Sequence, residues 1–160
     1  MEIDRTITNI WTIVVEEKDV LDRMIDETIQ EGDRRTAGNA PSLLASDDNK
    51  AILHRYYCSA LAELSAVLAK RTRKYGGGIG NETDPDTKMI KTTFFMPMTD
   101  NHEAALVEPL GADCLEFLVA RLMEQWYGHG SDFGGNMRKD QIRGVLNYRR
   151  WPIERPNRPL

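Results

Sequence analysis

The stretch that decides the fold runs from Ser46 to Tyr75, "SDDNKAILHRYYCSALAELSAVLAKRTRKY". Apolar residues recur in it at intervals of three and four for about 25 residues, which places them on one face of an α-helix. Ser46 and Asp47 suit the helix N-terminus because their side chains can accept backbone hydrogen bonds there. The basic "KRTRKY" suits the negative end of the helix dipole. The predicted apolar face comprises Ile52, Leu53, Tyr56, Tyr57, Ala60, Leu61, Leu64, Val67 and Leu68.

Three further helices are predicted by the same spacing. One covers Glu16 to Glu31, with Gly32 placed to stop it, and another covers Glu108 to Tyr127, with Pro109 in its first turn. The last covers Gly135 to Arg149, because the prolines that follow cannot continue a helix. We therefore expect a mainly α fold, a bundle of about four helices.

Two segments rich in β-branched and aromatic residues predict a small β element. One is "ITNIWTIVV", in the region Ile3 to Val15, and the other is "MIKTTFFMPM", a strand near residues 88 to 97. Residues 76 to 88 contain four glycines and almost nothing to bury, so we predict a flexible loop or the tip of a β-hairpin. The second strand could pair with the first, or with the end of the segment that follows the long helix.

The chain has 160 residues and a mass of 18.2 kDa, enough for one domain whose core needs no disulfide or metal. We predict that residues 1 to 150 form a single helical domain and that residues 151 to 160 form an extended arm rich in proline and arginine. No apolar run approaches the roughly 20 residues that span a bilayer, and the N-terminus lacks the pattern of a signal peptide. We therefore expect the protein to stay in the cytoplasm where it is made, with no membrane partner.

Charge is distributed unevenly along the chain. From residue 138 on there are seven Lys and Arg residues and two acidic residues, a net charge of +5. The first 137 residues contain 14 Lys and Arg residues and 23 acidic residues, a net charge of −9. An acidic body with a basic end favours self-association between unlike surfaces of neighbouring copies, or binding of a polyanion by the tail.

The glycine-rich "KYGGGIGN" superficially resembles a phosphate-binding loop. A Walker loop needs Lys and a hydroxyl after its glycines, and a dinucleotide-binding loop needs a strand before it and a helix after it. Here "NETDPD" follows, which places acidic residues where phosphate would lie. We predict no nucleotide site and no cofactor.

His54 and Cys58 are four residues apart on the long helix, so both could face one metal ion. The pair supplies only two ligands, and His102, His129 and Cys114 form no recognisable second pair. We interpret the pair as a buried cysteine beside a partly exposed histidine, and we predict no metal site. Both cysteines are expected to stay reduced in the cytoplasm.

Catalytic motifs are not apparent in the sequence. It contains no G-x-S-x-G segment, and no Ser, His and acidic residue are placed in a way that indicates a triad. We therefore predict that the protein is not an enzyme.

The C-terminal "NYRRWPIERPNRPL" is the clearest functional signal. A frayed end does not explain it, because Trp151, Ile153 and Leu160 are costly to leave in water. Nucleic-acid contact is one alternative, with arginines on phosphates and Trp151 stacked on a base. Docking on a protein is favoured, since proline lowers the cost of ordering and Trp and Arg are typical interface anchors. The predicted partner-binding residues are Arg149, Arg150, Trp151, Ile153, Arg155, Arg158 and Leu160.

The second half of the chain combines "ALVEPLGADCLEFLVARLMEQWYGHG" with "FGGNMRKDQIRGVLNYRRWPIERPNRPL", two helices and a tail of arginine and proline. Together with the strand segment before it, this order of elements resembles the small head–tail connector, or neck, proteins of tailed bacteriophages. The likeness covers most of the chain.

The resemblance implies a structural virion protein of the neck, assembled as a homo-oligomeric ring of twelve copies. Its partners would be other copies of itself, the portal protein, and tail or other neck proteins. DNA would pass through the acidic ring without sequence-specific binding. The alternatives are a tail-completion or tail-terminator subunit, and a small nucleic-acid-binding regulator that uses the basic tail.

Overall fold

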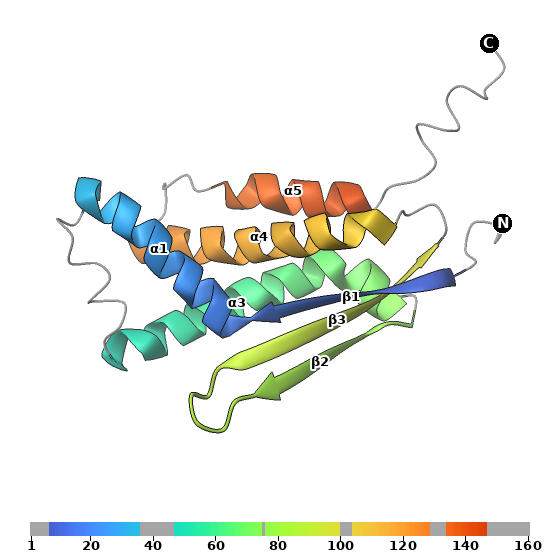
Figure 1. The fold of residues 1–160 in the computed structure, drawn as a ribbon, viewed down its shortest axis with the longest axis horizontal. Coiled ribbons are helices and arrows are strands. Elements are labelled where there is room, and N and C mark those ends of the chain that lie inside the picture. Colours follow the sequence, from blue (N-terminus) through green and yellow to red (C-terminus); the bar gives the residue numbers. More distant parts are fainter. Residues whose placement is uncertain (1–6, 36–46, 75, 100–103, 129–133, 147–160) are drawn as a thin grey trace, which may run out of the picture.

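The computed structural model describes residues 7 to 35, 47 to 74, 76 to 99, 104 to 128 and 134 to 146. These residues form four α-helices and three β-strands, so the predicted mainly α fold with a small β element is confirmed (Figure 1). The helices are α1 (Glu17–Arg35), α3 (Asp47–Ala69), α4 (Val107–Tyr127) and α5 (Gly135–Leu146). The strands are β1 (Ile7–Glu16), β2 (Gly78–Thr83) and β3 (Ile90–Thr99).

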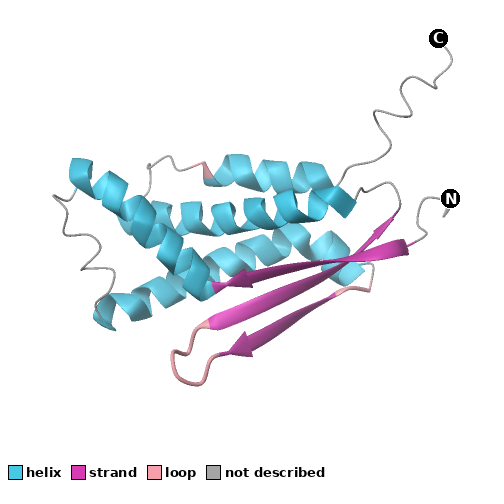
Figure 2. Cartoon of the chain, viewed as in Figure 1, coloured by secondary structure: helices cyan, strands magenta, loops and turns pink. Residues whose placement is uncertain are grey.

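The three strands form an antiparallel sheet in the order β1-β3-β2, which puts β3 in the middle. The helices lie together on one side of this sheet (Figure 2). Because successive side chains of a strand point to opposite faces, alternate residues of β1 and β3 are buried beneath the helices. These inward residues are Trp11, Ile13, Val15, Thr92, Phe94, Met96 and Met98.

Helix α4 lies at the centre of the core, in contact with α1, α3, α5 and β1 (Figure 1). A helix with neighbours on several sides is apolar around most of its circumference, which is wider than the single stripe of an amphipathic surface helix. The buried residues of α4 are Leu110, Cys114, Phe117, Leu118, Val119, Ala120, Leu122 and Met123.

The prediction of a flexible loop over residues 76 to 88 is corrected in part, because Gly78–Thr83 forms strand β2 and pairs with β3. The hydrogen bonds between paired strands are made by backbone groups alone. A glycine-rich segment at the edge of a sheet can therefore pair as a strand although it has few large side chains. Gly78 pairs with Phe95, and a Cβ added to Gly80 would lie 3.9 Å from the Phe95 ring. Both glycines of the strand thus lie beside Phe95 on the neighbouring strand with space for a Cβ.

Two helix boundaries also differ from the prediction. Helix α1 continues through Gly32 to Arg35, so the prediction that Gly32 stops it is wrong. Glycine lowers the stability of a helix interior by about 1 kcal/mol relative to alanine, but it does not break the helix as proline does. Helix α5 is described to Leu146, and the predicted continuation to Arg149 lies outside the described residues.

The basic turn after α3 has a different role from the one that its sequence indicated. Lys70–Lys74 forms a π-helical turn in which Arg71 is buried. The Nη2 atom of Arg71 donates a hydrogen bond of 3.3 Å to the backbone oxygen of Leu146, the last residue of α5. Arg71 therefore connects the turn after α3 to α5, a helix distant in the sequence.

Candidate functional site

The predicted partner-binding residues of the C-terminal arm lie outside the described residues, as do all residues from 147 to 160. Three features of the described part bear on function instead. They are the sheet face turned away from the helices, a cluster of Glu17, His54 and Cys58, and a polar network that joins three helices.

The outer sheet face is the side of the sheet that the helices leave uncovered, formed by Ile10, Thr12, Val14, Thr93 and Phe95. Ile10 is 59% exposed, Val14 47% and Phe95 42%. Among the described residues only one other large apolar side chain, Met137 on α5, is exposed. Isolated apolar residues on a surface are common, whereas a group of them on one face is a candidate binding surface.

The edges of the sheet are open as well. Strands β1 and β2 each pair with β3, and neither has a second strand neighbour among the described strands. An edge strand presents unpaired backbone groups to which another chain can add. One row across the sheet, formed by Glu16, Lys91 and Glu82, alternates in charge and bounds the apolar part of the outer sheet face.

The second feature is a chain of polar contacts from Glu17 through His54 to Cys58. Glu17 is the first residue of α1, directly after β1, and its side chain is 2% exposed. Its carboxylate lies 2.9 Å from Nδ1 of His54, on α3. On the other side of the imidazole ring, Nε2 lies 3.5 Å from Sγ of Cys58, one helical turn further along α3. Three side chains from two parts of the chain are thus aligned.

The hydrogen-bond partners of this cluster indicate which atoms carry protons. The Glu17 carboxylate also accepts a hydrogen bond of 3.0 Å from the backbone N–H of Ile90, at the start of β3. An ionised carboxylate only accepts, so Nδ1 of His54 carries a proton, and in the neutral imidazole Nε2 presents its lone pair to Cys58. The Cys58 thiol then donates to Nε2.

Burial, and then the negative charge of Glu17, raises the pKa of the Cys58 thiol. The same two causes, in the same order, raise the pKa of the buried Tyr57 hydroxyl. Cys58 is therefore a thiol near neutral pH, and the cluster does not present a thiolate nucleophile. The interpretation of Cys58 as a buried residue is also corrected, since Cys58 is partly exposed and the buried member of the cluster is Glu17.

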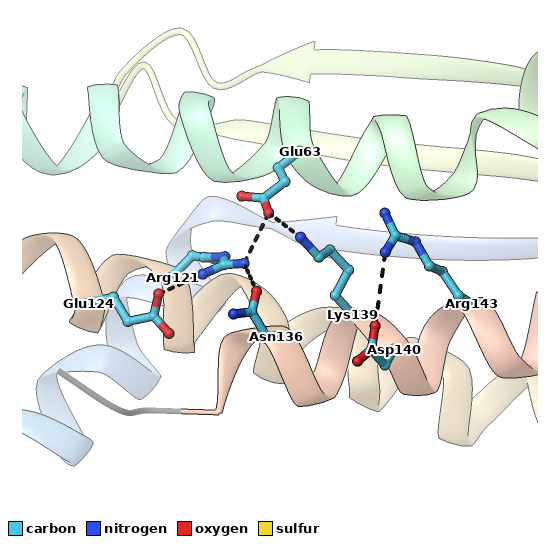
Figure 3. A network of polar contacts seen from close by, with 7 residues as sticks. All are labelled: Glu63, Arg121, Glu124, Asn136, Lys139, Asp140 and Arg143. Carbon is cyan, nitrogen blue, oxygen red and sulfur yellow. Dashed lines mark hydrogen bonds and ion pairs between the residues drawn. The ribbon is translucent and has the colours of Figure 1, made fainter. Parts of the chain in front are cut away.

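The third feature is the polar network between α3, α4 and α5 (Figure 3). Glu63 on α3 accepts hydrogen bonds of 3.0 Å from both Arg121 on α4 and Lys139 on α5. Arg121 also donates to Glu124 at 2.6 Å and to Asn136 at 2.7 Å. The network therefore links α3, α4 and α5 through these four hydrogen bonds.

The sequence identified two of the three members of the cluster. His54 and Cys58 were found from their spacing, whereas Glu17 is one of two acidic residues in the first turn of α1, where the helix dipole alone favours a negative charge. A signal was present, because Glu17 continues the inward alternation of Trp11, Ile13 and Val15. An acidic residue at the next inward position indicates a buried carboxylate that needs partners.

Comparison with protein families, with curated proteins and with solved structures finds no match to this chain. No helix in the described part is both long and apolar enough to cross a membrane. In the described ranges, no group of three or more His, Cys, Asp or Glu side chains is arranged to hold a metal ion.

Proposed function

We propose that the protein is a structural subunit of a tailed-phage virion, which assembles with copies of itself into the ring of a head–tail connector. The observation that supports this proposal is the outer sheet face, on which Ile10, Val14 and Phe95 are exposed together between two open edges. The resemblance of the element order to connector proteins supplies the class of assembly.

The energetics favour a repeated contact of this kind. Burying a large apolar side chain contributes about 1.5–3 kcal/mol, and roughly half of each of these three side chains is already covered. The outer sheet face would then contribute a few kcal/mol to one contact, which is weak in isolation. In a closed ring every subunit makes two such contacts, so weak contacts add up to a stable assembly.

The charge distribution fits the same arrangement. The first 137 residues carry a net charge of −9, and the remainder carries +5. A ring is built from head-to-tail contacts between unlike surfaces, for which opposite charges are complementary. A ring with an acidic body would also repel the DNA phosphates that pass through it, so the DNA would not adhere.

The mass of the full-length protein in solution tests self-assembly. We expect a multiple of 18.2 kDa, and ring-shaped particles in electron microscopy. Val14→Lys combined with Phe95→Lys should shift the mass toward one chain, because two charges would be buried in the contact. Met137→Lys is the control for a single lysine, since it places one such charge on α5, away from the sheet.

Detection of the protein in purified phage particles tests its biological setting. A neck position, between portal and tail, is expected for a connector, whereas a tail-terminator subunit would remain with detached tails. A protein that stays monomeric at every concentration and is missing from particles would contradict the proposal.

A further inference from the structure

The Glu17–His54–Cys58 cluster has the geometry of a partly built metal site. Tetrahedral zinc binds sulfur at about 2.3 Å and imidazole nitrogen at about 2.0–2.1 Å, which separates the two ligand atoms by about 3.6 Å. The Sγ atom of Cys58 and Nε2 of His54 are 3.5 Å apart. The spacing of these two atoms therefore matches that of two ligands of one tetrahedral ion, which would lie to one side of the line that joins them.

Glu17 is the hydrogen-bond acceptor that a metal-binding histidine usually has on its second ring nitrogen. Histidine ligands commonly donate their second N–H to a carboxylate, which fixes the tautomer and the orientation of the ring. The Glu17 carboxylate takes this place at 2.9 Å from Nδ1, and the Ile90 N–H holds it there at 3.0 Å. In the neutral ring, Nε2 is thus the nitrogen without a proton, and it lies next to the Cys58 thiol.

A cation can reach this pair of ligand atoms from solvent. The His54 side chain is 40% exposed, and Cys58 is partly exposed. The negative charge of the buried Glu17 favours a cation beside the ring. A thiol and an imidazole together select zinc-like ions, because magnesium and calcium prefer oxygen ligands.

We propose that Nε2 of His54 and Sγ of Cys58 are two ligands of a zinc-class divalent cation, with Glu17 as the residue that positions the histidine. Binding displaces the Cys58 proton to solvent, and the thiolate and the neutral imidazole each donate a lone pair to the ion. This site does not depend on the proposed connector function. It departs from the prediction of no metal, because Glu17 was not recognised from the sequence as the partner of His54.

Titration of the reduced, chelator-treated full-length protein with Co²⁺ tests the site, since a cobalt–thiolate bond gives a near-ultraviolet charge-transfer band. We expect a saturable band that Zn²⁺ abolishes, and that is lost in Cys58→Ser and in His54→Gln. Cys114→Ser is the matched control and should keep the band, because Cys114 is fully buried on α4. Glu17→Gln should keep the band while weakening Co²⁺ affinity by about 10–100-fold.

Far-UV circular dichroism of each variant shows whether it is folded. No band in the folded wild type, or a band that survives Cys58→Ser and disappears in Cys114→Ser, would overturn the proposal. The stoichiometry then identifies the remaining ligands. One ion per two chains with a doubled mass means that the same pair in a second copy completes the site, and one ion per chain without a change of mass means that water or the same chain does.

Discussion

Nη2 of Arg121 lies 3.0 Å from Oε1 of Glu63, and this ion pair joins α4 to α3 within the helical layer. The Arg121 side chain is only 15% exposed, and its guanidinium carbon stands 5.4 Å from the centre of the Phe117 ring. The guanidinium is therefore largely shielded from solvent, whereas the Glu63 side chain is 37% exposed, so solvent screens the pair in part.

Replacing Arg121 with Met should lower the free energy of unfolding by about 2 kcal/mol, because Glu63 and Glu124 would each lose a hydrogen-bond donor at a partly buried position. The measurement is urea denaturation followed by circular dichroism. Arg143→Met is the matched control (Figure 3). Arg143 is 52% exposed and 3.9 Å from Asp140, so its loss should change stability by no more than about 0.5 kcal/mol. Equal effects of the two changes would show that the network does not hold the helices.

Gly77 and Gly78 should respond very differently to alanine. A Cβ on Gly77 would lie 2.0 Å from the Phe95 carbonyl oxygen and 2.8 Å from that of Arg71, so Gly77→Ala must displace backbone and should cost about 2 kcal/mol. A Cβ on Gly78 meets nothing within 4 Å, and Gly78→Ala should leave stability unchanged or slightly raised. Thermal unfolding of both variants gives the comparison. A stable Gly77→Ala protein would mean that β2 can move away from β3 at little cost.

The two cysteines should differ in their reaction with iodoacetamide at pH 8. Burial raises the pKa of the Cys114 thiol to about 12, so only about one molecule in ten thousand carries the reactive thiolate at this pH. Cys58 is partly exposed and should be modified first, although its own raised pKa slows the reaction. Peptide mass spectrometry follows both sites. Cys114 should react only after unfolding, and modification of Cys114 in the native protein at the rate of Cys58 would contradict the described core.

The tip of the β2–β3 hairpin should depend on pH. Oδ1 of Asp84 accepts hydrogen bonds from the backbone N–H groups of Asp86 at 2.8 Å and Thr87 at 3.0 Å, and these bonds lower the pKa of Asp84. A lowered folded pKa means that the stabilisation is fully present above the ordinary value of 3.8 and is lost as the pH falls through the folded value. Amide chemical shifts of Asp86 and Thr87 should report this change. Asp84→Ala should abolish it, whereas Asp86→Ala removes the same charge and should leave it intact.

Most of the helical part of the fold could be predicted from local patterns. The apolar face around Leu53, Tyr57 and Leu64 is spaced at the helical period, and these residues are fully or almost fully buried in α3. Periodicity reports which face is apolar, and the hydrophobic effect then requires that face to be covered. The order of the strands could not be predicted. The sequence allowed β3 to pair with β1 or with the segment after α3, and either pairing agrees with the alternation of inward and outward side chains.

The missed features depend on contacts between distant residues. Strand β2 is stabilised by its pairing with β3, so the glycine content of residues 78 to 83 was misleading. Arg71 binds Leu146, 75 residues away, and Glu17 binds His54, 37 residues away. A single sequence contains no record of such pairs, since neither partner changes the local pattern around the other. The residues predicted to bind partners, from Arg149 to Leu160, lie outside the described part and remain a prediction.

Arg71 has a mechanical consequence for the C-terminal sequence. Residues 147 to 160 follow Leu146, whose carbonyl Arg71 holds, and the carbonyl of Arg71 itself lies beside Gly77 at the start of the hairpin. A load applied to the backbone at Leu146 would thus be passed through the Lys70–Lys74 turn into the sheet, and we expect α5 to resist unravelling. In single-molecule extension, Arg71→Met should lower the force at which α5 detaches, and an unchanged force would show that α5 bears the load alone.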